Sequence, residues 1–288
     1  MPRDADIVAP HGRLVRRLLT LYGIAMYLFL FVPIVVLVLL SFNTSRTVGF
    51  PLKHLTLAWY RLLPDDVLIQ DALSSSIRIG LWVTVISTVI GTAAAFPLVR
   101  ARMRYRSVVR VLITLPIMIP GLLIGVSLLI LFTDVLKVQP GSSTAIVGQS
   151  VLVTPFVILI VAARLQGFDQ NLERAASDLG ANLLQRMRYV VLPLIAPGIL
   201  AAALIALTLS IDEFIVTNFL IGSGQTLPIY VYNQIKFGIT PEVNALASLM
   251  LLGTMLVFAL GFAIPPIIRR VRLRRALAHA DDRLTTVP

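Results

Sequence analysis

Residues 171–193 read NLERAASDLGANLLQRMRYVVLP, a polar, arginine-containing stretch between two long apolar segments. Its apolar residues recur at intervals of three and four: Leu172, Ala175, Ala176, Leu179, Leu183 and Met187. This spacing predicts one face of a helical segment. Gly180 interrupts that face, and Asn182 follows two residues later. A glycine that ends one helix and an asparagine that begins the next predict two short helices meeting at an angle.

The chain around this stretch is strongly apolar. Hydrophobic residues make up 57% of its 288 residues, charged residues make up 14%, and the mean hydropathy is +0.89. Water-soluble globular chains do not reach these values, so the composition predicts an integral membrane protein. In a soluble chain the net charge of +11 would suggest nucleic-acid binding. Here the arginines follow the expected membrane topology, and we expect no nucleic-acid partner.

Six apolar segments are long enough to cross a bilayer as helices, which takes about 20 residues each. They lie at residues 18–42, 74–99, 109–133, 144–163, 194–221 and 243–268. The sequence therefore predicts an all-α membrane protein with a single domain at 18–268, whose longest loop on the arginine-rich side is 164–193. Tails at 1–17 and 269–288 complete the chain. The first segment lacks a small-residue cleavage site, so we expect it to be a retained helix.

Lysine and arginine are divided unequally between the two ends of these helices. Nineteen of the 25 basic residues lie in the two tails and in the second and fourth connections. The opposite side has six: Arg46, Lys53, Arg61, Arg78, Lys137 and Lys236. Positive charge concentrates on the cytoplasmic side of membrane proteins. We therefore expect both termini and the 164–193 loop to be cytoplasmic.

Several kinds of chemistry are excluded by residues that the chain lacks. It has no cysteine, which excludes disulfides, thiol nucleophiles and cysteine metal sites. His11, His54 and His279 lie outside the apolar segments, which argues against an intramembrane serine protease. No Gly-Lys-Ser/Thr sequence occurs, so the chain has no phosphate-binding loop of its own. We expect no catalytic residue and no metal site, and active transport would need ATP hydrolysis by a partner.

The 171–193 stretch resembles the cytoplasmic loop of the permease subunits of bacterial ABC importers, with its Glu-Ala-Ala, Gly and Leu-Pro pattern. The matching positions are Ala175, Ala176, Gly180, Val190, Leu192 and Pro193. Arg174 stands where the family usually has Glu, and Glu173 is displaced by one, so the usual ion pair is not implied. Arg174 is either a solvated charge or a partner for the ATPase. The alternative for the whole stretch is an ordinary loop along the membrane surface.

The resemblance implies a coupling helix between helices 4 and 5 that docks on an ATPase subunit. The coupling residues would be Glu173, Arg174, Ala175, Ala176, Asp178, Gly180 and Leu183. It also implies the type I importer permease fold and a place in the bacterial inner membrane. The implied partners are a homodimer of ATPase subunits, a second permease subunit, an extracytoplasmic solute-binding protein and membrane lipid. ATP and Mg would be bound by the ATPase, with no cofactor in this chain.

Further stretches resemble the C-type permease of polyamine importers: LSIDEF at 209–214, GSGQTLPIYVY at 222–232 and FGITPEVNA at 237–245. This likeness implies a small cationic solute similar to spermidine or putrescine. Opines and aminophosphonates remain alternatives, because selectivity is set by a binding protein outside this chain. A stand-alone secondary transporter is a further alternative. It would show an inverted repeat, and the proline positions of the two halves show none that is clear.

Asp212 and Glu213 are the carboxylates placed well inside an apolar segment. A carboxylate at mid-helix costs about 2.5 to 3.5 kcal/mol on insertion scales, so we expect both to face a polar cavity or paired groups. Two interpretations stay open. One charge lines the outer half of the route for a cation, or the pair holds the fifth helix by an ion pair or a helix-end hydrogen bond.

Three smaller features concern packing. We expect Trp59 and Tyr60 to anchor at the level of the lipid headgroups rather than to bind a ligand. Gly121 and Gly125 have the Gly-x-x-x-Gly spacing of close helix packing. The second segment has a row of small residues that also allows close helix approach: Thr84, Ser87, Thr88, Gly91 and Thr92. Prolines in segments three to five predict helix interruptions beside neighbouring helices or a cavity.

Overall fold

The computed structural model describes residues 10–45, 54–101, 104–238, 240–259 and 261. The predicted tail 269–288 lies outside this range. Within it the chain is helical, apart from turns and one antiparallel bridge between Asn43 and Leu55. The chain divides into two compact units, Met1–Asp65 with Gln234–Met250 and Asp66–Asn233 with Leu251–Pro288.

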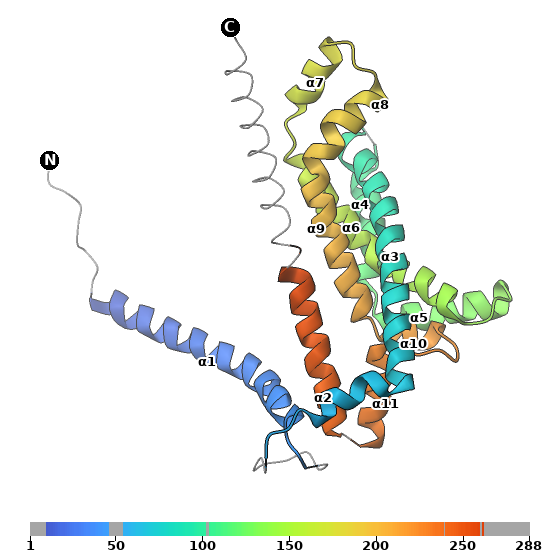
Figure 1. The fold of residues 1–288 in the computed structure, drawn as a ribbon. Helices are drawn as coiled ribbons and strands as arrows, with labels where there is room; N and C mark the ends of the chain where they lie inside the picture. Colours follow the sequence, from blue (N-terminus) through green and yellow to red (C-terminus); the bar gives the residue numbers. More distant parts are fainter. Residues whose placement is uncertain (1–9, 46–53, 102–103, 239, 260, 262–288) are drawn as a thin grey trace, which may run out of the picture. The chain divides into compact units, whose positions relative to one another are not determined.

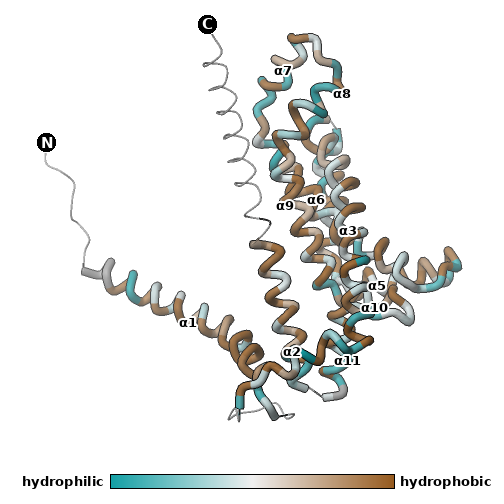
Figure 2. Tube along the Cα trace, viewed as in Figure 1, coloured by the Kyte–Doolittle hydropathy of each residue, from teal (hydrophilic) through white to brown (hydrophobic). Residues whose placement is uncertain are grey.

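The first unit holds helix α1 (Pro10–Ser41), helix α2 (Ala58–Leu62) and the 3₁₀ turn η1 (Leu63–Asp65). Helix α1 begins earlier than the predicted span at residue 18. Its second half is almost entirely hydrophobic (Figure 2), and its most apolar window buries nothing against the rest of the chain. A helix of this kind is stable only in an apolar surrounding such as a bilayer.

The aromatic residues of α2 are tied to the end of α1. The indole Nε1 of Trp59 donates to the carbonyl of Asn43 at 2.8 Å, and the Tyr60 hydroxyl lies 2.6 Å from Ser41 Oγ. Both Ser41 and Asn43 are buried. Trp59 and Tyr60 therefore fasten α2 to α1, in addition to any role at the headgroup level.

Three long helices form the core of the second unit: α3 (Val67–Arg100), α6 (Ser142–Gln166) and α9 (Leu192–Ile211), which run side by side in Figure 1. Small residues let them approach closely. A Cβ at Gly91 would lie 2.6 Å from Val157 Cγ1, and one at Gly198 would lie 2.6 Å from Arg164 Cγ. The predicted packing row on the second segment is confirmed at Gly91, since no larger residue fits there.

The third predicted span is bent. Helix α4 (Arg106–Met118) and helix α5 (Gly121–Ile130), with the π-helical turn η2 (Leu131–Val135), meet at 95°. Pro120 lies in the break, where its missing N–H and fixed φ interrupt the helix. The proline interruption predicted for the third segment is therefore confirmed at Pro120, and the apolar stretch over 109–133 is not one straight helix. Gly125 packs against Phe219, whose Cδ2 would lie 2.9 Å from an added Cβ, so this glycine serves packing within the chain.

The predicted bounds of the fifth span, 194–221, are wrong at both ends. A single helix runs over Leu183–Ile211, through α8 (Leu183–Arg186), the π-helical turn η3 (Met187–Val191) and α9. In η3 the amide of Leu192 bonds to the carbonyl of Met187, five residues back, just before Pro193. A wide turn next to a proline lets the helix continue without the N–H that proline lacks. Residues beyond 211 form a separate short helix, α10 (Ile215–Leu220).

Helix α11 (Leu227–Phe237) and a last helix over Pro241–Ala259 follow. Five helices of the described residues are long and apolar enough to cross a membrane, or six if the bent pair is one span. The predicted number of six segments is thus confirmed if the bent pair α4 and α5 is counted as one span. The end of the sixth prediction, residues 262–268, falls outside the described range.

Candidate functional site

The break that Gly180 makes has the predicted local geometry. Helix α7 (Gln170–Asp178) ends as the amides of Gly180 and Ala181 bond to the carbonyls of Ser177 and Ala176 at 2.9 and 3.0 Å. Gly180 has φ +83°, a left-handed conformation that disfavours other residues. The prediction of a glycine stop is confirmed.

A new helix starts directly after this turn. Asn182 Oδ1 accepts from the amide of Gln185, and Gln185 Oε1 accepts from the amide of Asn182, both at 2.8 Å. This reciprocal pair satisfies two of the free N–H groups at the start of α8. The predicted N-cap is confirmed, although α8 is the first turn of the long helix and not a separate short one.

Apolar side chains around the Gly180 turn are open to the surroundings. Leu179 is 89% exposed, and Leu183 and Leu184 are also exposed. Leucines at such exposure on a hydrophilic turn form an unpartnered apolar patch. Of the coupling residues predicted from sequence, Gly180, Leu183, Arg174, Ala175 and Asp178 are all exposed.

The displaced acid, Glu173, is engaged inside the chain. Its Oε2 lies 2.7 Å from Nη1 of Arg100, the last residue of α3. The Arg100 guanidinium also lies over the rings of Phe96 and Phe168, at 5.5 and 5.7 Å from their centroids. Sequence reasoning missed Arg100, because nothing in its own neighbourhood marks it as a partner of α7.

Arg174 lies beside this pair, in a hollow of about 440 Å³ that Arg100, Glu173, Asp178 and Arg186 also line. The side chain is exposed, and among residues 10–259 that the structure describes it makes no ion pair. Glu173 and Arg174, adjacent in sequence, thus differ: one is held within the chain and the other is open.

A second break, between α9 and α10, carries Asp212 and Glu213. The sequence predicted both carboxylates inside a continuous helix. The structure instead places them in the connection between Ile211 and Ile215. The Glu213 carboxylate accepts hydrogen bonds from the amides of Val216 and Thr217, at 3.0 and 2.9 Å. It thereby satisfies two N–H groups at the start of α10, which explains why the span ends here.

Asp212 is in a different position. Its side chain is exposed, and no hydrogen bond or ion pair of its carboxylate is found within the described part of the chain. Of the two predicted interpretations, the helix-end hydrogen bond is therefore realised by Glu213. Asp212 takes no part in this cap.

A buried glutamine joins the two sides of this break. Gln149 of α6 accepts a hydrogen bond from Ser210 Oγ, and its Nε2 donates to Thr217 Oγ1 at 2.6 Å. Thr217 Oγ1 in turn donates to Glu213 Oε2 at 2.8 Å. Sequence reasoning missed Gln149. The available signal was an amide side chain inside an otherwise apolar segment.

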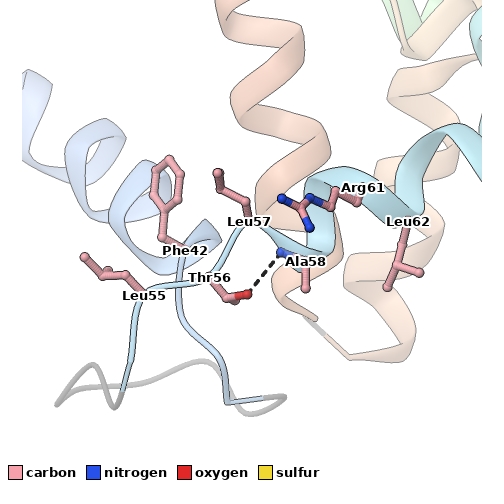
Figure 3. Close-up of a pocket in the computed structure, with 7 residues that line it drawn as sticks. All are labelled: Phe42, Leu55, Thr56, Leu57, Ala58, Arg61 and Leu62. Atoms are coloured by element: carbon pink, nitrogen blue, oxygen red, sulfur yellow. Dashed lines mark hydrogen bonds between the residues drawn. The ribbon is translucent and has the colours of Figure 1, made fainter.

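One hollow lies in the first unit, between the end of α1 and α2 (Figure 3). It measures about 770 Å³ and is lined by Phe42, Leu55, Thr56, Leu57, Ala58, Arg61 and Leu62. In Figure 3, Thr56 Oγ1 accepts from the amide of Ala58, at 3.1 Å. Arg61 is the one charged residue in the lining, so this hollow does not suit a cationic ligand.

Metal ligands do not gather in the part of the chain that the structure describes. No group there combines three or more His, Asp or Glu side chains at a distance that could hold an ion.

Residues 87–274, which contain both breaks and Gln149, match the sequence profile described as binding-protein-dependent transport system inner membrane component. The chain belongs to this permease family. The chain is also 35% identical over 228 residues to the spermidine/putrescine transport system permease protein PotC of Escherichia coli (strain K12), an alignment that covers 79% of this chain and 86% of that protein. The putrescine transport system permease protein PotI of the same strain is 35% identical, with 78% and 82% covered.

Solved structures share the fold of this permease. A bacterial ABC transporter involved in the import of the acidic polysaccharide alginate matches with a TM-score of 0.71 at 15% identity, covering 91% of this chain and all of that one. An inward-facing MetNI methionine ABC transporter matches with a TM-score of 0.60 at 22% identity, covering 69% and 94%. The chain therefore has the importer permease fold predicted from its sequence, and it is a multi-pass membrane protein.

Proposed function

We propose that the permease forms half of the translocation pathway of an ATP-driven importer for a polyamine-like cation. The observation that carries this proposal is the 35% identity to two permeases of polyamine transport, over more than three quarters of the chain in each case. The solved structures that match the fold belong to a methionine ABC transporter and to a transporter involved in the import of an acidic polysaccharide, so the fold alone does not select the solute.

The electrostatics of the α9/α10 break support a cationic solute. Asp212 offers an exposed carboxylate without a partner among the described residues. An unpaired carboxylate in a membrane region is costly unless it faces water or a cation, so Asp212 lines the route and attracts positive charge. Glu213 acts beside it by keeping the break in place, through its bonds to Val216 and Thr217.

The Gly180 turn is the site at which ATP hydrolysis is coupled to transport. Its exposed leucines, Leu179, Leu183 and Leu184, give an apolar surface for a groove of the ATPase subunit. The turn lies in the cytoplasm, together with both termini. ATP and Mg are bound by the ATPase homodimer, and the chain itself has no catalytic residue. A second permease subunit completes the pathway, and a solute-binding protein delivers the solute from outside.

Uptake into proteoliposomes tests this proposal. The permease is copurified with its ATPase, its sister permease and its binding protein, and radiolabelled spermidine and putrescine are offered with ATP inside. We expect saturable uptake that needs both ATP and the binding protein. In this system Asp212→Asn raises the KM for spermidine by about tenfold, the equivalent of one lost charge contact of about 1.4 kcal/mol.

The competing solutes define the outcome that overturns the proposal. If the binding protein takes up an opine or an aminophosphonate and ignores polyamines, the solute class is wrong while the importer remains. Uptake without ATP and without the binding protein would instead indicate a secondary transporter. The control variant is Ser223→Ala, at an exposed serine outside the break, and it should keep the wild-type KM for spermidine.

A further inference from the structure

Two of the residues in the α9/α10 break keep a right-handed backbone, although the helix is interrupted. Asp212 has φ −85° and ψ −7°, and Phe214 has φ −105° and ψ −48°, both in the right-handed region. The break contains neither glycine nor proline, and none of its residues has a positive φ. Neither a glycine nor a proline therefore forces the interruption, and side-chain hydrogen bonds help to hold it.

Gln149 is the side chain that reaches both sides. It is 1% exposed, it belongs to another helix, and it uses the two ends of its amide on opposite sides of the break. Its Oε1 accepts from Ser210 in the last turn of α9, and its Nε2 donates to Thr217 in α10. A planar amide fixes the separation of two partners, because its oxygen and nitrogen cannot move independently.

The same amide orders the cap of α10. Because Thr217 Oγ1 accepts from Gln149, its own hydrogen is left for the Glu213 carboxylate, which it meets at 2.8 Å. Glu213 then has three donors: the Val216 amide, the Thr217 amide and the Thr217 hydroxyl. Such bonds in a low-dielectric surrounding reinforce one another. Glu213 is thereby held in the cap while Asp212 is not.

From this geometry we propose that Gln149 is a positioning residue for Asp212, and that it holds the α9/α10 break so that this carboxylate is presented to the solute. This inference rests on the proposed function, in which Asp212 meets the cation. Without Gln149 the hydrogen bonds that link Ser210 and Thr217 across the break are lost, and residues 211–215 are free to close towards a continuous helix. Closure turns Asp212 about the helix axis, since neighbouring positions on a helix differ by about 100°.

Gln149→Met tests the proposal, because methionine keeps the length and the volume of glutamine and removes both hydrogen bonds. Thr217 keeps the Glu213 carboxylate as an acceptor, so the variant is expected to fold. The matched control is Thr154→Val on the same helix, which removes the bond from Thr154 Oγ1 to Ser87 Oγ, remote in sequence from the break.

Two measurements are made on the purified importer. Hydrogen exchange of peptides covering residues 211–220 is expected to be about tenfold faster in Gln149→Met and unchanged in Thr154→Val. Uptake is expected to show a KM raised by about fivefold, with the maximal rate per folded transporter within about twofold of wild type. A merely structural defect lowers the amount and the maximal rate but leaves the KM as it was.

Unchanged exchange in Gln149→Met overturns the proposal, because the break then holds without this amide. Faster exchange with an unchanged KM also overturns it, because the geometry of the break is then irrelevant to the solute. If Asp212→Asn does not alter uptake, the proposed function has failed at this site. The exchange measurement needs no solute, and it still decides whether Gln149 holds the break.

Discussion

The two helix breaks of the permease are built in opposite ways. At Gly180 the chain turns through a left-handed residue, and an added Cβ would meet no heavy atom within 4 Å. At the α9/α10 break Asp212 and Phe214 keep a right-handed backbone, and the interruption is held by hydrogen bonds among Gln149, Ser210, Thr217 and Glu213. The first break is a property of the local sequence. The second is a property of the packed core.

This difference decides how each break responds to change. A glycine turn in open space depends chiefly on residues close to it in sequence, because no packed core surrounds it. A break held by side chains depends on residues far apart in sequence, and it can close when one of them is lost. A turn of the first kind suits a fixed docking point, and one of the second kind suits a place that moves.

The largest effect is expected from the positions of the Gly180 turn and of the turn that follows α10, which we place on opposite sides of the membrane. The chain has no cysteine, so single cysteines at Leu179 and Ser223 report without interference from its own residues. A membrane-impermeant thiol reagent added to intact cells should label the Ser223→Cys variant and not the Leu179→Cys variant. Permeabilised cells should show both labelled, and a reversed pattern in intact cells contradicts the proposed topology.

Next in size is the effect of losing the cap of α10. Glu213→Ala removes a carboxylate with three hydrogen bonds, and we expect the purified importer to lose about 2 kcal/mol of stability, measured as a lower midpoint of thermal unfolding. Asp212→Ala is the matched control, because that carboxylate has no bond to lose among the described residues. Equal losses of stability in the two variants would contradict our assignment of the helix cap to Glu213 alone.

The glycine turn should respond more weakly in stability and more strongly in assembly. Gly180→Val places a β-branched residue at φ +83°, which costs about 1 to 2 kcal/mol. We expect the permease to remain in the membrane while ATPase copurification and uptake fall. Gly180→Asn, which tolerates this conformation better, should retain most of both. Full ATPase recovery with Gly180→Val would show that the bend is not needed for docking.

The smallest effect is expected from the ion pair that joins α7 to α3. Arg100 and Glu173 are both partly exposed, so their pairing contributes about 0.5 to 1 kcal/mol. A double-mutant cycle with Arg100→Gln and Glu173→Gln, read in thermal unfolding, should return a coupling of that size. The same cycle on Arg100 and Arg174 should return none, and coupling there would contradict the exposed placement of Arg174.

The contrast between the breaks also explains what the sequence could predict. The helix end at Gly180 and the helix start at Asn182 depend on residues within a few positions of each. Both were therefore predicted from the sequence. The break at Asp212 could not be, since it depends on Gln149 more than sixty positions earlier and on contacts that exist only in the folded chain. The same reason applies to Arg100 and Glu173, which meet only when α3 and α7 are in place.

Helix continuity was predicted poorly for a related reason. Pro120 does bend its span, whereas Pro193 does not, because the π-helical turn over Met187–Val191 absorbs the missing N–H. Proline alone gives no indication of which response will occur. The solute was predicted from resemblance alone and stays a prediction, since the residues of a binding protein would set it.

The unbroken helix from Leu183 to Ile211 has a mechanical consequence. Its 29 residues make a rod about 43 Å long, with the glycine turn at one end and the carboxylates at the other. A rod that tilts by about 5° about its midpoint carries each end through about 2 Å, in opposite senses. A displacement of the helix end beside Asn182 therefore displaces the end at Ser210 in the opposite direction. This coupling needs only a rigid helix and no chain of side-chain contacts.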